Sequence, residues 1–347
     1  MINKKLLAEL CEVAGAPGHE NRVRKIVLKE VKNYVDEISI DNMGNVVALK
    51  KGKKNKKVMI GAHMDEIGFI VTHIDDKGFV YFHTLGGFDP KTLTAQRVII
   101  HGKKDVVGVM GSKPIHLMNT ADREKTPAIK DYFIDTGLAK KKIEKIICVG
   151  NPITRERKMI EMGDCLNCKS LDNRVSVFIL IEMFKEMKET PPYDVYGVFT
   201  VQEEIGIRGA NVSSMQINPD FGFGLDTTIA WDTPGSTKQE QVSALGEGAC
   251  IKVMDSSTVC DYRMVAYMKG VAEKNKIKTQ LEILPAGGTD TSGIQRMNPG
   301  GSIAGAVSIP TRHIHQVIEM VNKNDVRASI DLLRHCVENL HNYDWNF

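Results

Sequence analysis

The chain has 347 residues, of which 42% are hydrophobic and 26% are charged, and its formal net charge is +3. This length fits one large α/β domain or two smaller domains, and the small charge argues against nucleic-acid binding. No apolar run approaches the roughly 18 residues that a membrane span needs. The 7 cysteines are scattered and no secretory signal is recognisable, so we expect a cytoplasmic protein with reduced thiols and no membrane partner.

Two helices are predicted at the start of the chain, over residues 3–14 and 19–34, with Pro17-Gly18 between them. In the second helix, apolar residues recur at spacings of three and four, which makes one buried stripe. The lysine-rich run at 50–57 is predicted to be a solvated turn between two strands. Alternating or apolar patterns that end in turn residues predict strands at 36–41, 45–50 and 58–62.

The pattern of hydrophobic and turn residues changes between Ile67 and about Ile160. Short alternating runs are separated by turn residues there, with a single weak helical pattern near 139–145. This spacing predicts a small all-β barrel. We therefore expect an α/β domain formed by residues 1–67 and 163–347, with a β-barrel domain inserted at 68–162.

Strands and helices alternate throughout the second half of the chain. A helix is predicted at 173–189, a strand at 195–201 and another strand that ends at Leu225. Such alternation implies a mostly parallel sheet covered on both faces, that is, a three-layer α/β/α domain. The remaining predicted elements are strands at 249–254, 279–284 and 302–309 and helices at 261–274 and 324–341.

Polar residues follow several of the predicted strands. His63 and Asp65 follow the strand at 58–62, and side chains two apart on an extended chain face the same way. Ligands in open α/β sheets sit outside the carboxyl ends of the strands. Other acidic or histidine residues at such ends, or at the start of a helix, are Asp172, Glu203, Glu204, Asp226, His313 and His315.

Each of these residues alone has a plain structural interpretation. Asp172 fits the N-cap of a helix, and Glu203 and Glu204 fit solvated charge at the start of a loop. Together, however, histidines and several carboxylates at one sheet edge are typical of a two-metal hydrolase site.

Five motifs occur in order along the chain. They are Gly-Ala-His-Met-Asp-Glu-Ile-Gly-Phe at 61–69, Leu-Asp-Asn-Arg at 171–174, Val-Gln-Glu-Glu-Ile-Gly-Ile-Arg-Gly-Ala at 201–210, Gly-Leu-Asp at 224–226 and Pro-Thr-Arg-His-Ile-His at 310–315. On these motifs the chain closely resembles the tetrahedral metallo-aminopeptidases, which include glutamyl aminopeptidases and proteins once labelled cellulase M. The resemblance extends to residues 107–117 of the predicted barrel and to Gly287-Gly288-Thr289-Asp290.

The resemblance implies two divalent metal ions per chain, zinc by expectation, with cobalt or manganese as alternatives. His63 and Asp226 would hold one ion, and Glu204 and His315 the other. Asp172 would bridge the two ions.

The resemblance also implies that two further residues have catalytic roles. Glu203 would be the general base that takes a proton from the attacking water, and Asp65 would orient His63. The family further implies a homo-oligomeric cage, commonly a dodecamer built from dimers, in which the β insertion serves assembly and access of short peptides.

Three departures or ambiguities accompany this resemblance. The family commonly has Tyr where this chain has His313, so His313 competes with His315 as the ligand, and the motif favours His315. Asn173 stands where the family has a second Asp. The Gly287–Asp290 loop is expected either to line the substrate pocket or to form a tight turn whose Asp caps a helix.

Four functions from different classes remain open at this point. A metal-dependent aminopeptidase is favoured. Another di-zinc amidohydrolase, such as a deacylase or carboxypeptidase, would share the metals and differ in its pocket. An endoglucanase would need two carboxyl groups and generally no metal. A binding module on the same fold would have no need of Glu203.

Overall fold

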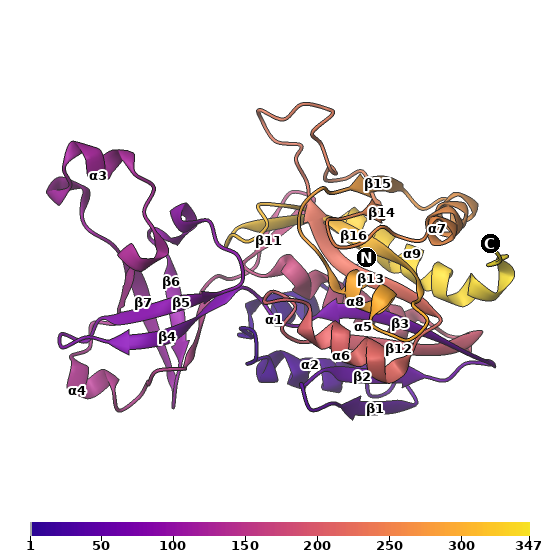
Figure 1. The fold of residues 1–347 in the computed structure, drawn as a ribbon, viewed down its shortest axis with the longest axis horizontal. Coiled ribbons are helices and arrows are strands. Elements are labelled where there is room, and N and C mark those ends of the chain that lie inside the picture. Colours follow the sequence, from indigo (N-terminus) through magenta and orange to yellow (C-terminus); the bar gives the residue numbers. More distant parts are fainter. Residues whose placement is uncertain (1) are drawn as a thin grey trace.

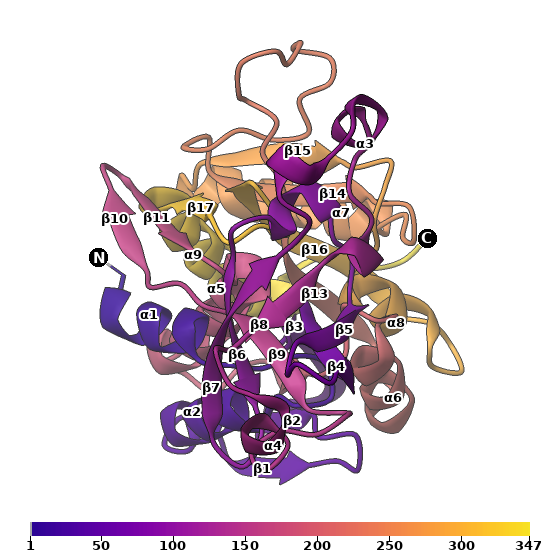
Figure 2. The ribbon, with the colours of Figure 1, turned by 90° about the vertical axis from the view of Figure 1, so that its left-hand side faces the viewer.

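The computed structural model describes residues 2–347, and in those residues the chain forms two parts of unequal size (Figure 1). A large sheet with helices makes the larger part, and a closed six-stranded barrel projects from it. Figure 2 shows the barrel in front of the larger part. Among the described residues, no helix has the length and apolar character needed to cross a membrane.

Both predicted N-terminal helices are present, and the second confirms the predicted apolar stripe. They are α1 (Lys4–Glu12) and α2 (Asn21–Val31), and the side chain of Asn3 accepts a hydrogen bond from the Leu6 N–H at 3.2 Å, which caps α1. The apolar positions of both helices are buried: Leu6, Leu7, Leu10 and Cys11 in α1, and Val23, Ile26, Val27 and Val31 in α2.

The large sheet has 11 strands, and its centre is parallel, as the alternating pattern predicts. Four neighbouring strands, β12, β3, β13 and β16, run in the same direction. The order is β1-β2-β12-β3-β13-β16-β17-β11-β10, and β14 joins β16 to β15. The bounds are β1 Glu37–Ile40, β2 Val46–Lys50, β3 Lys54–His63, β10 Ile160–Met162, β11 Cys165–Cys168, β12 Tyr193–Thr200, β13 Phe221–Ile229, β14 Ala249–Met254, β15 Thr279–Ile283, β16 Ile303–Arg312 and β17 Glu319–Asn322.

Helices cover both faces of this sheet, which gives the predicted three layers. On one face, α5 contacts β3 and β13, and α9 contacts β16 and β14. On the other face, α6 and α8 pack on each other and on β3. Figure 1 shows these layers. The bounds are α5 Leu171–Glu186, α6 Arg208–Ile217, α7 Tyr262–Asn275, α8 Asp290–Arg296 and α9 Lys323–Asn339.

One glycine allows a close approach between β13 and α8. A Cβ atom on Gly224 would lie 1.9 Å from Oγ1 of Thr291. Glycine therefore lets α8 pack against the strand two residues before Asp226.

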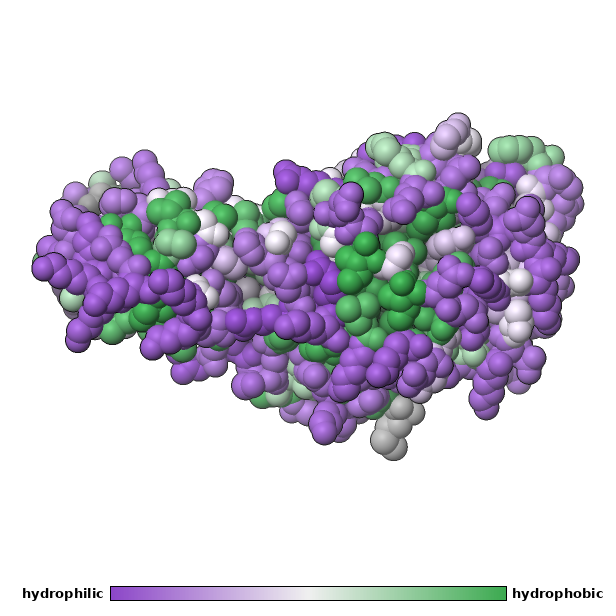
Figure 3. Space-filling view, turned by 90° about the horizontal axis from the view of Figure 1, so that it is seen from below, coloured by the Kyte–Doolittle hydropathy of each residue, from purple (hydrophilic) through white to green (hydrophobic). Residues whose placement is uncertain are grey.

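The inserted segment forms a closed barrel in the order β4-β5-β8-β7-β6-β9, which confirms the predicted barrel. Its apolar core is separate from that of the large sheet and includes Phe69, Val98 and Ile134. The bounds are β4 Gly68–Ile74, β5 Val80–Leu85, β6 Arg97–His101, β7 Asp105–Gly111, β8 Phe133–Asp135 and β9 Pro152–Arg155, with short helices α3 Thr120–Glu124 and α4 Lys140–Ile143. Figure 3 shows a mostly hydrophilic surface with hydrophobic side chains gathered near the middle of the molecule.

Several predicted bounds were wrong by a few residues. β3 begins at Lys54, within the lysine-rich run, because backbone pairing of Lys54 with Tyr193 requires no apolar side chain. β16 continues to Arg312, because it pairs with β13 as far as Thr311. The division into 1–67 with 163–347 and 68–162 stays a prediction, and β10 pairs within the large sheet.

Candidate metal centre

The predicted metal-site residues come from five elements that meet at one edge of the large sheet. His63 is the last residue of β3, and Asp172 stands in the first turn of α5. Because β3, β12, β13 and β16 are parallel, their carboxyl ends meet there. Glu203 and Glu204 follow β12, and His315 follows β16. Asp226 lies inside β13, which ends at Ile229, so the prediction that the strand ends at Leu225 was wrong.

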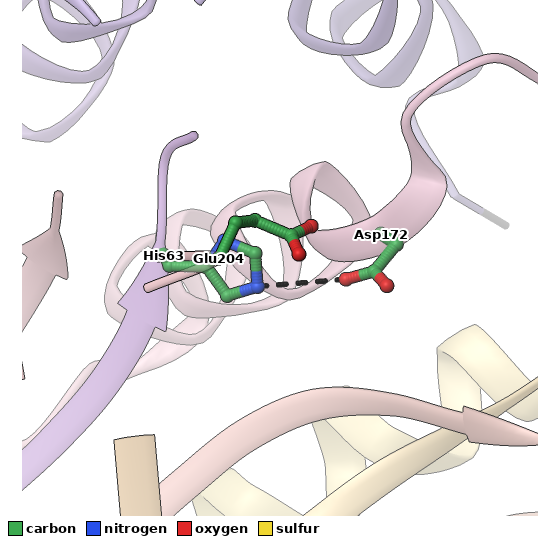
Figure 4. Close-up of side chains that lie close together, drawn as sticks. All are labelled: His63, Asp172 and Glu204. Carbon is green, nitrogen blue, oxygen red and sulfur yellow. Dashed lines mark ion pairs between the residues drawn. The ribbon is translucent and has the colours of Figure 1, made fainter. Parts of the chain in front are cut away.

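Asp172 faces both histidines. Its Oδ1 atom lies 3.4 Å from Nε2 of His63, and its Oδ2 atom lies 3.5 Å from Nε2 of His315. Glu204 Oε2 is also 3.5 Å from Nε2 of His315. Figure 4 shows His63 at the end of its strand with Asp172 and Glu204 beside it. Ligand atoms of these three residues all lie within 4.8 Å of one another.

The other side of His63 is enclosed by more carboxylates. Nε2 of His63 lies 3.8 Å from Oδ1 of Asp226 and 3.8 Å from Oε2 of Glu203. Nδ1 of His63 lies 3.4 Å from Oδ1 of Asp65. Nδ1 also lies 3.2 Å from the backbone carbonyl oxygen of Asp65, which is its hydrogen-bond partner. Asp65 thus holds the imidazole at Nδ1, while Nε2 faces the other acids.

Asp65 also fixes the segment that carries both glutamates. Its Oδ1 atom accepts the Glu203 N–H at 3.0 Å, and its Oδ2 atom accepts the Glu204 N–H at 3.1 Å. Asp65 is fully buried. One carboxylate thus connects the end of β3 to the turn after β12.

Burial and mutual repulsion change the pKa values of these acids in the metal-free protein. Burial, and then the charge of Asp172, raise the pKa of Glu204 to about 8. Burial is also the main cause of the raised pKa values of Glu203 and Asp226. For Asp172, contacts with His315 and His63 outweigh burial and lower the pKa.

These residues fit divalent metal ions. Oε1 of Glu204 is buried and has no hydrogen-bond partner. A buried carboxylate oxygen without a partner costs free energy, which a cation would offset. Imidazole nitrogens and carboxylate oxygens are also the donors that zinc, cobalt and manganese accept. The cluster therefore suits a pair of dications.

The structure reveals a buried acid that the sequence analysis missed. Oε2 of Glu319 accepts the Asp172 N–H at 2.9 Å, and Oε1 accepts the His315 N–H at 3.1 Å. Glu319 opens β17 and is 1% exposed. The only sequence signal was its position four residues after His315.

A second buried network lies behind the site. Glu66 forms an ion pair with Lys169 and lies 3.5 Å from NH2 of Arg174, and all three side chains are buried. Arg174 NH1 also donates to the Leu10 carbonyl at 2.7 Å. This network connects the end of α1, the segment before β4 and the start of α5, which carries Asp172. Glu66 was visible in the sequence next to Asp65, although its partners were not.

The ambiguous residues have distinct positions. His313 is exposed on the wall of the cavity, whereas His315 contacts Asp172 and Glu204. Asn173 donates to the Leu225 carbonyl at 2.8 Å, so it helps to position β13.

The glycine-rich loop lines the cavity. Gly287, Gly288 and Thr289 form part of the cavity wall. Thr289, not Asp290, is the N-cap residue of α8, and a carboxylate oxygen of Asp290 accepts a hydrogen bond from Thr200 at the end of β12. The loop therefore shapes the pocket, and the prediction of a capping Asp was wrong.

A cavity of about 680 Å³ opens over the cluster. Its lining includes His63, Asp172, Glu203, Glu204, Asp226 and His315. The volume is within the range of small-molecule sites, which is roughly 300–1,000 Å³.

Comparison with protein families decides the assignment. The model of the M42 glutamyl aminopeptidase family matches residues 44–332. The chain belongs to the M42 peptidase family. Two relatives are similar to this chain over nearly their whole lengths. A putative aminopeptidase of Acetivibrio thermocellus is 37% identical over 94% of this chain and 96% of its own. The lysyl aminopeptidase of Pyrococcus furiosus is 32% identical over 99% of both chains.

Solved structures agree with the M42 assignment. Aminopeptidase APDkam598 from Desulfurococcus kamchatkensis superposes with a TM-score of 0.93 at 36% identity, over 96% of this chain and 94% of its own. The Pyrococcus horikoshii TET1 peptidase superposes with a TM-score of 0.87 at 27% identity, over 96% of this chain and 98% of the TET1 chain. That peptidase can assemble into a tetrahedron or a large octahedral shell. At least one structural neighbour of this chain thus forms large assemblies.

Proposed function

We propose that this M42 peptidase is a metal-dependent aminopeptidase that releases N-terminal residues from short peptides. The observation that carries the proposal is the position of Asp172, whose two oxygens face Nε2 of His63 and Nε2 of His315 at 3.4 and 3.5 Å. A carboxylate between two imidazoles suits two dications held roughly 3.5–4 Å apart.

The two metal positions follow from the side chains on either side of Asp172. His63 and Asp226 would hold one dication, Glu204 and His315 would hold the other, and Asp172 would be shared between the two positions. We expect zinc, with cobalt or manganese as alternatives, because mixed imidazole and carboxylate sites accept all three. When bound, the metals supply Lewis-acid activation of the attacking water and of the peptide carbonyl.

Glu203 is the residue that moves the proton. It lies at the cavity wall beside His63 and is not needed as a ligand in this assignment. Its carboxylate takes the proton of the water and delivers it to the leaving amine. Asp65 contacts Nδ1 of His63 and accepts the Glu203 N–H, so it fixes the position of Glu203 relative to His63.

A free N-terminal amine fits this site better than a blocked one. Asp172, Glu203, Glu204 and Asp226 place several carboxylates around one end of the cavity, where they attract an ammonium group. The cavity volume of about 680 Å³ accommodates the first residues of a short peptide.

The inserted domain, residues 68–162, serves assembly and substrate access in this proposal. Oligomeric M42 relatives such as the TET1 peptidase support a homo-oligomer, and we propose a dodecamer built from dimers. The discontinuous catalytic domain, residues 1–67 and 163–347, contains the whole metal cluster. We place the protein in the cytoplasm, where short peptides are its substrates.

Hydrolysis of matched substrates tests this function. Metal-depleted protein and protein reloaded with zinc or cobalt are compared on a free-amine aminoacyl anilide and on its N-acetylated form. We expect activity with the reloaded protein and the free amine alone. Equal hydrolysis of the N-blocked form would indicate a different amidohydrolase, and cellulose hydrolysis insensitive to chelators would indicate an endoglucanase.

A further inference from the structure

The cavity extends from the metal cluster across a wall that contains no described lysine or arginine. This wall is formed by the end of β13 and the loops at 284–289 and 313–316. His313, an exposed imidazole, is the one basic side chain on the described part of this wall outside the metal cluster. An acidic substrate side chain would find no lysine or arginine there to pair with, so the loss of hydration of its carboxylate would be poorly compensated.

Two buried cations of the described chain near this wall, Arg155 and Lys252, are already bonded to other groups. Nη1 of Arg155 donates to the His315 carbonyl at 3.0 Å, and Nη2 donates to the Lys169 carbonyl at 3.1 Å. Nζ of Lys252 lies 2.8 Å from Oδ2 of Asp255 and 3.4 Å from Oε1 of Glu282. Lys252 is fully buried and is not part of the cavity lining. It therefore cannot serve as the recognition group for a substrate carboxylate.

A basic side chain finds no free carboxylate on the same wall. Beyond the metal cluster, Asp255 is the one acid that lines the cavity in the described chain, and it is 2% exposed. Its Oδ2 atom accepts from Lys252 at 2.8 Å and from Thr289 Oγ1 at 3.2 Å. Its Oδ1 atom accepts the Ser257 N–H at 2.9 Å. Both oxygens are thus occupied.

The acids of the metal cluster do not change this conclusion. They lie at one end of the cavity, where the substrate amine of the proposed mechanism binds. The wall formed by the end of β13 and the loops at 284–289 and 313–316 receives the side chain, and its one acid in the described chain is Asp255.

The remaining wall is largely apolar. Ile207, Ile229, Trp231, Leu284 and Ile314 line the cavity. Leu284 is half-buried and Trp231 is 42% exposed, so both retain surface that a substrate side chain can cover. Covering this apolar surface removes it from water, which favours binding of an apolar side chain.

We infer that this peptidase prefers neutral, apolar N-terminal residues such as leucine, methionine or phenylalanine over acidic and basic ones. The inference rests on the proposed aminopeptidase function. It separates this chain from the glutamyl specificity in its family's description and from the lysyl specificity of its Pyrococcus furiosus relative.

A panel of free-amine anilides on the metal-loaded protein tests the inference. We expect kcat/KM for the leucyl substrate to exceed that for the glutamyl and lysyl substrates by on the order of 100-fold, because a charged side chain is left unpaired in the pocket. A glutamyl or lysyl substrate as the best of the panel would overturn the inference and leave the aminopeptidase function standing. Turnover of no free-amine substrate by protein with both metals bound would overturn both.

A charge placed on the wall gives a second test. Leu284→Lys adds a cation to the cavity lining, whereas Ile283→Lys adds the same charge at the neighbouring residue, which is 57% exposed and outside the lining. We expect Leu284→Lys to raise the glutamyl-to-leucyl ratio of kcat/KM by at least about 10-fold. Ile283→Lys should leave the ratio unchanged. An equal ratio in both variants would overturn the assignment of this wall as the specificity pocket.

Discussion

Oδ1 of Asp172 lies 3.4 Å from Nε2 of His63, across the gap between the start of a helix and the end of a strand. The two residues are 109 positions apart in the chain, and the inserted barrel lies between them in sequence. The other oxygen of Asp172 faces His315. This placement of one carboxylate between two imidazoles leads to the predictions below.

Glu203→Gln should keep both metals and lose most activity. Gln keeps the shape of the side chain but cannot accept the proton of the water, so we expect kcat to fall by about 10²–10⁴-fold. Metal analysis of the purified variant provides the control. Loss of metal in proportion to activity would show that Glu203 is a ligand and not the base.

His315→Ala and His313→Ala form a matched pair. We expect His315→Ala to release about one metal per chain, because its Nε2 faces Asp172 and Glu204. His313→Ala should retain both metals, because His313 is an exposed residue of the cavity wall. Metal counts in the reverse order would reassign the ligand to His313.

Glu319→Ala should weaken metal binding without removing a ligand. Glu319 accepts the backbone N–H groups of Asp172 and His315, so its loss frees both ligands to move. A loss of affinity of about 10–100-fold is typical when such an outer partner is removed. Competition with a chelating dye measures it, and Glu319→Gln, which keeps an accepting oxygen, should lose less. Unchanged affinity in Glu319→Ala would show that Glu319 does not position the ligands.

Metal binding should release protons and strengthen as the pH rises. In the metal-free protein the pKa of Glu204 is raised to about 8, mainly by burial. Burial lowers the pKa of His315, but the combined contacts with Asp172, Glu204 and Glu319 outweigh burial and raise it to about 9. At neutral pH both groups hold protons that a dication must displace. Affinity should therefore increase between about pH 6 and pH 8, and calorimetry in buffers of different ionisation enthalpy should detect the released protons. Affinity independent of pH would contradict this ionisation scheme.

Two glycine substitutions should change stability in opposite directions. In Gly224→Ala the new methyl group would lie 1.9 Å from Oγ1 of Thr291, so α8 must shift, at a cost of about 1–3 kcal/mol. Gly270 in α7 has open space around the same position, and Gly270→Ala should stabilise the helix by about 0.5–1 kcal/mol. Denaturant unfolding at constant metal loading measures both. Equal effects would show that the β13–α8 contact does not depend on Gly224.

The sequence predicted the layers, the barrel and the strand ends that carry the site. Apolar runs followed by His63 and by Glu203 located these ends, because parallel strands deliver their last residues to one edge. Asp226 was identified although its strand continues past it. The pairing that surrounds the site was not predictable. Glu319 reaches Asp172 and His315 through the pairing of β17, and Lys169 reaches Glu66 103 positions away, and no local spacing records such contacts.

The metal content of fully loaded, desalted protein tests the central claim most directly. We expect two metal ions per chain in the wild type and loss of both upon Asp172→Ala, because Asp172 is shared by the two positions. Elemental analysis of both proteins at equal concentration gives these counts. A wild type that saturates at one ion per chain, or an Asp172→Ala variant that retains two, would contradict the bridged two-metal site.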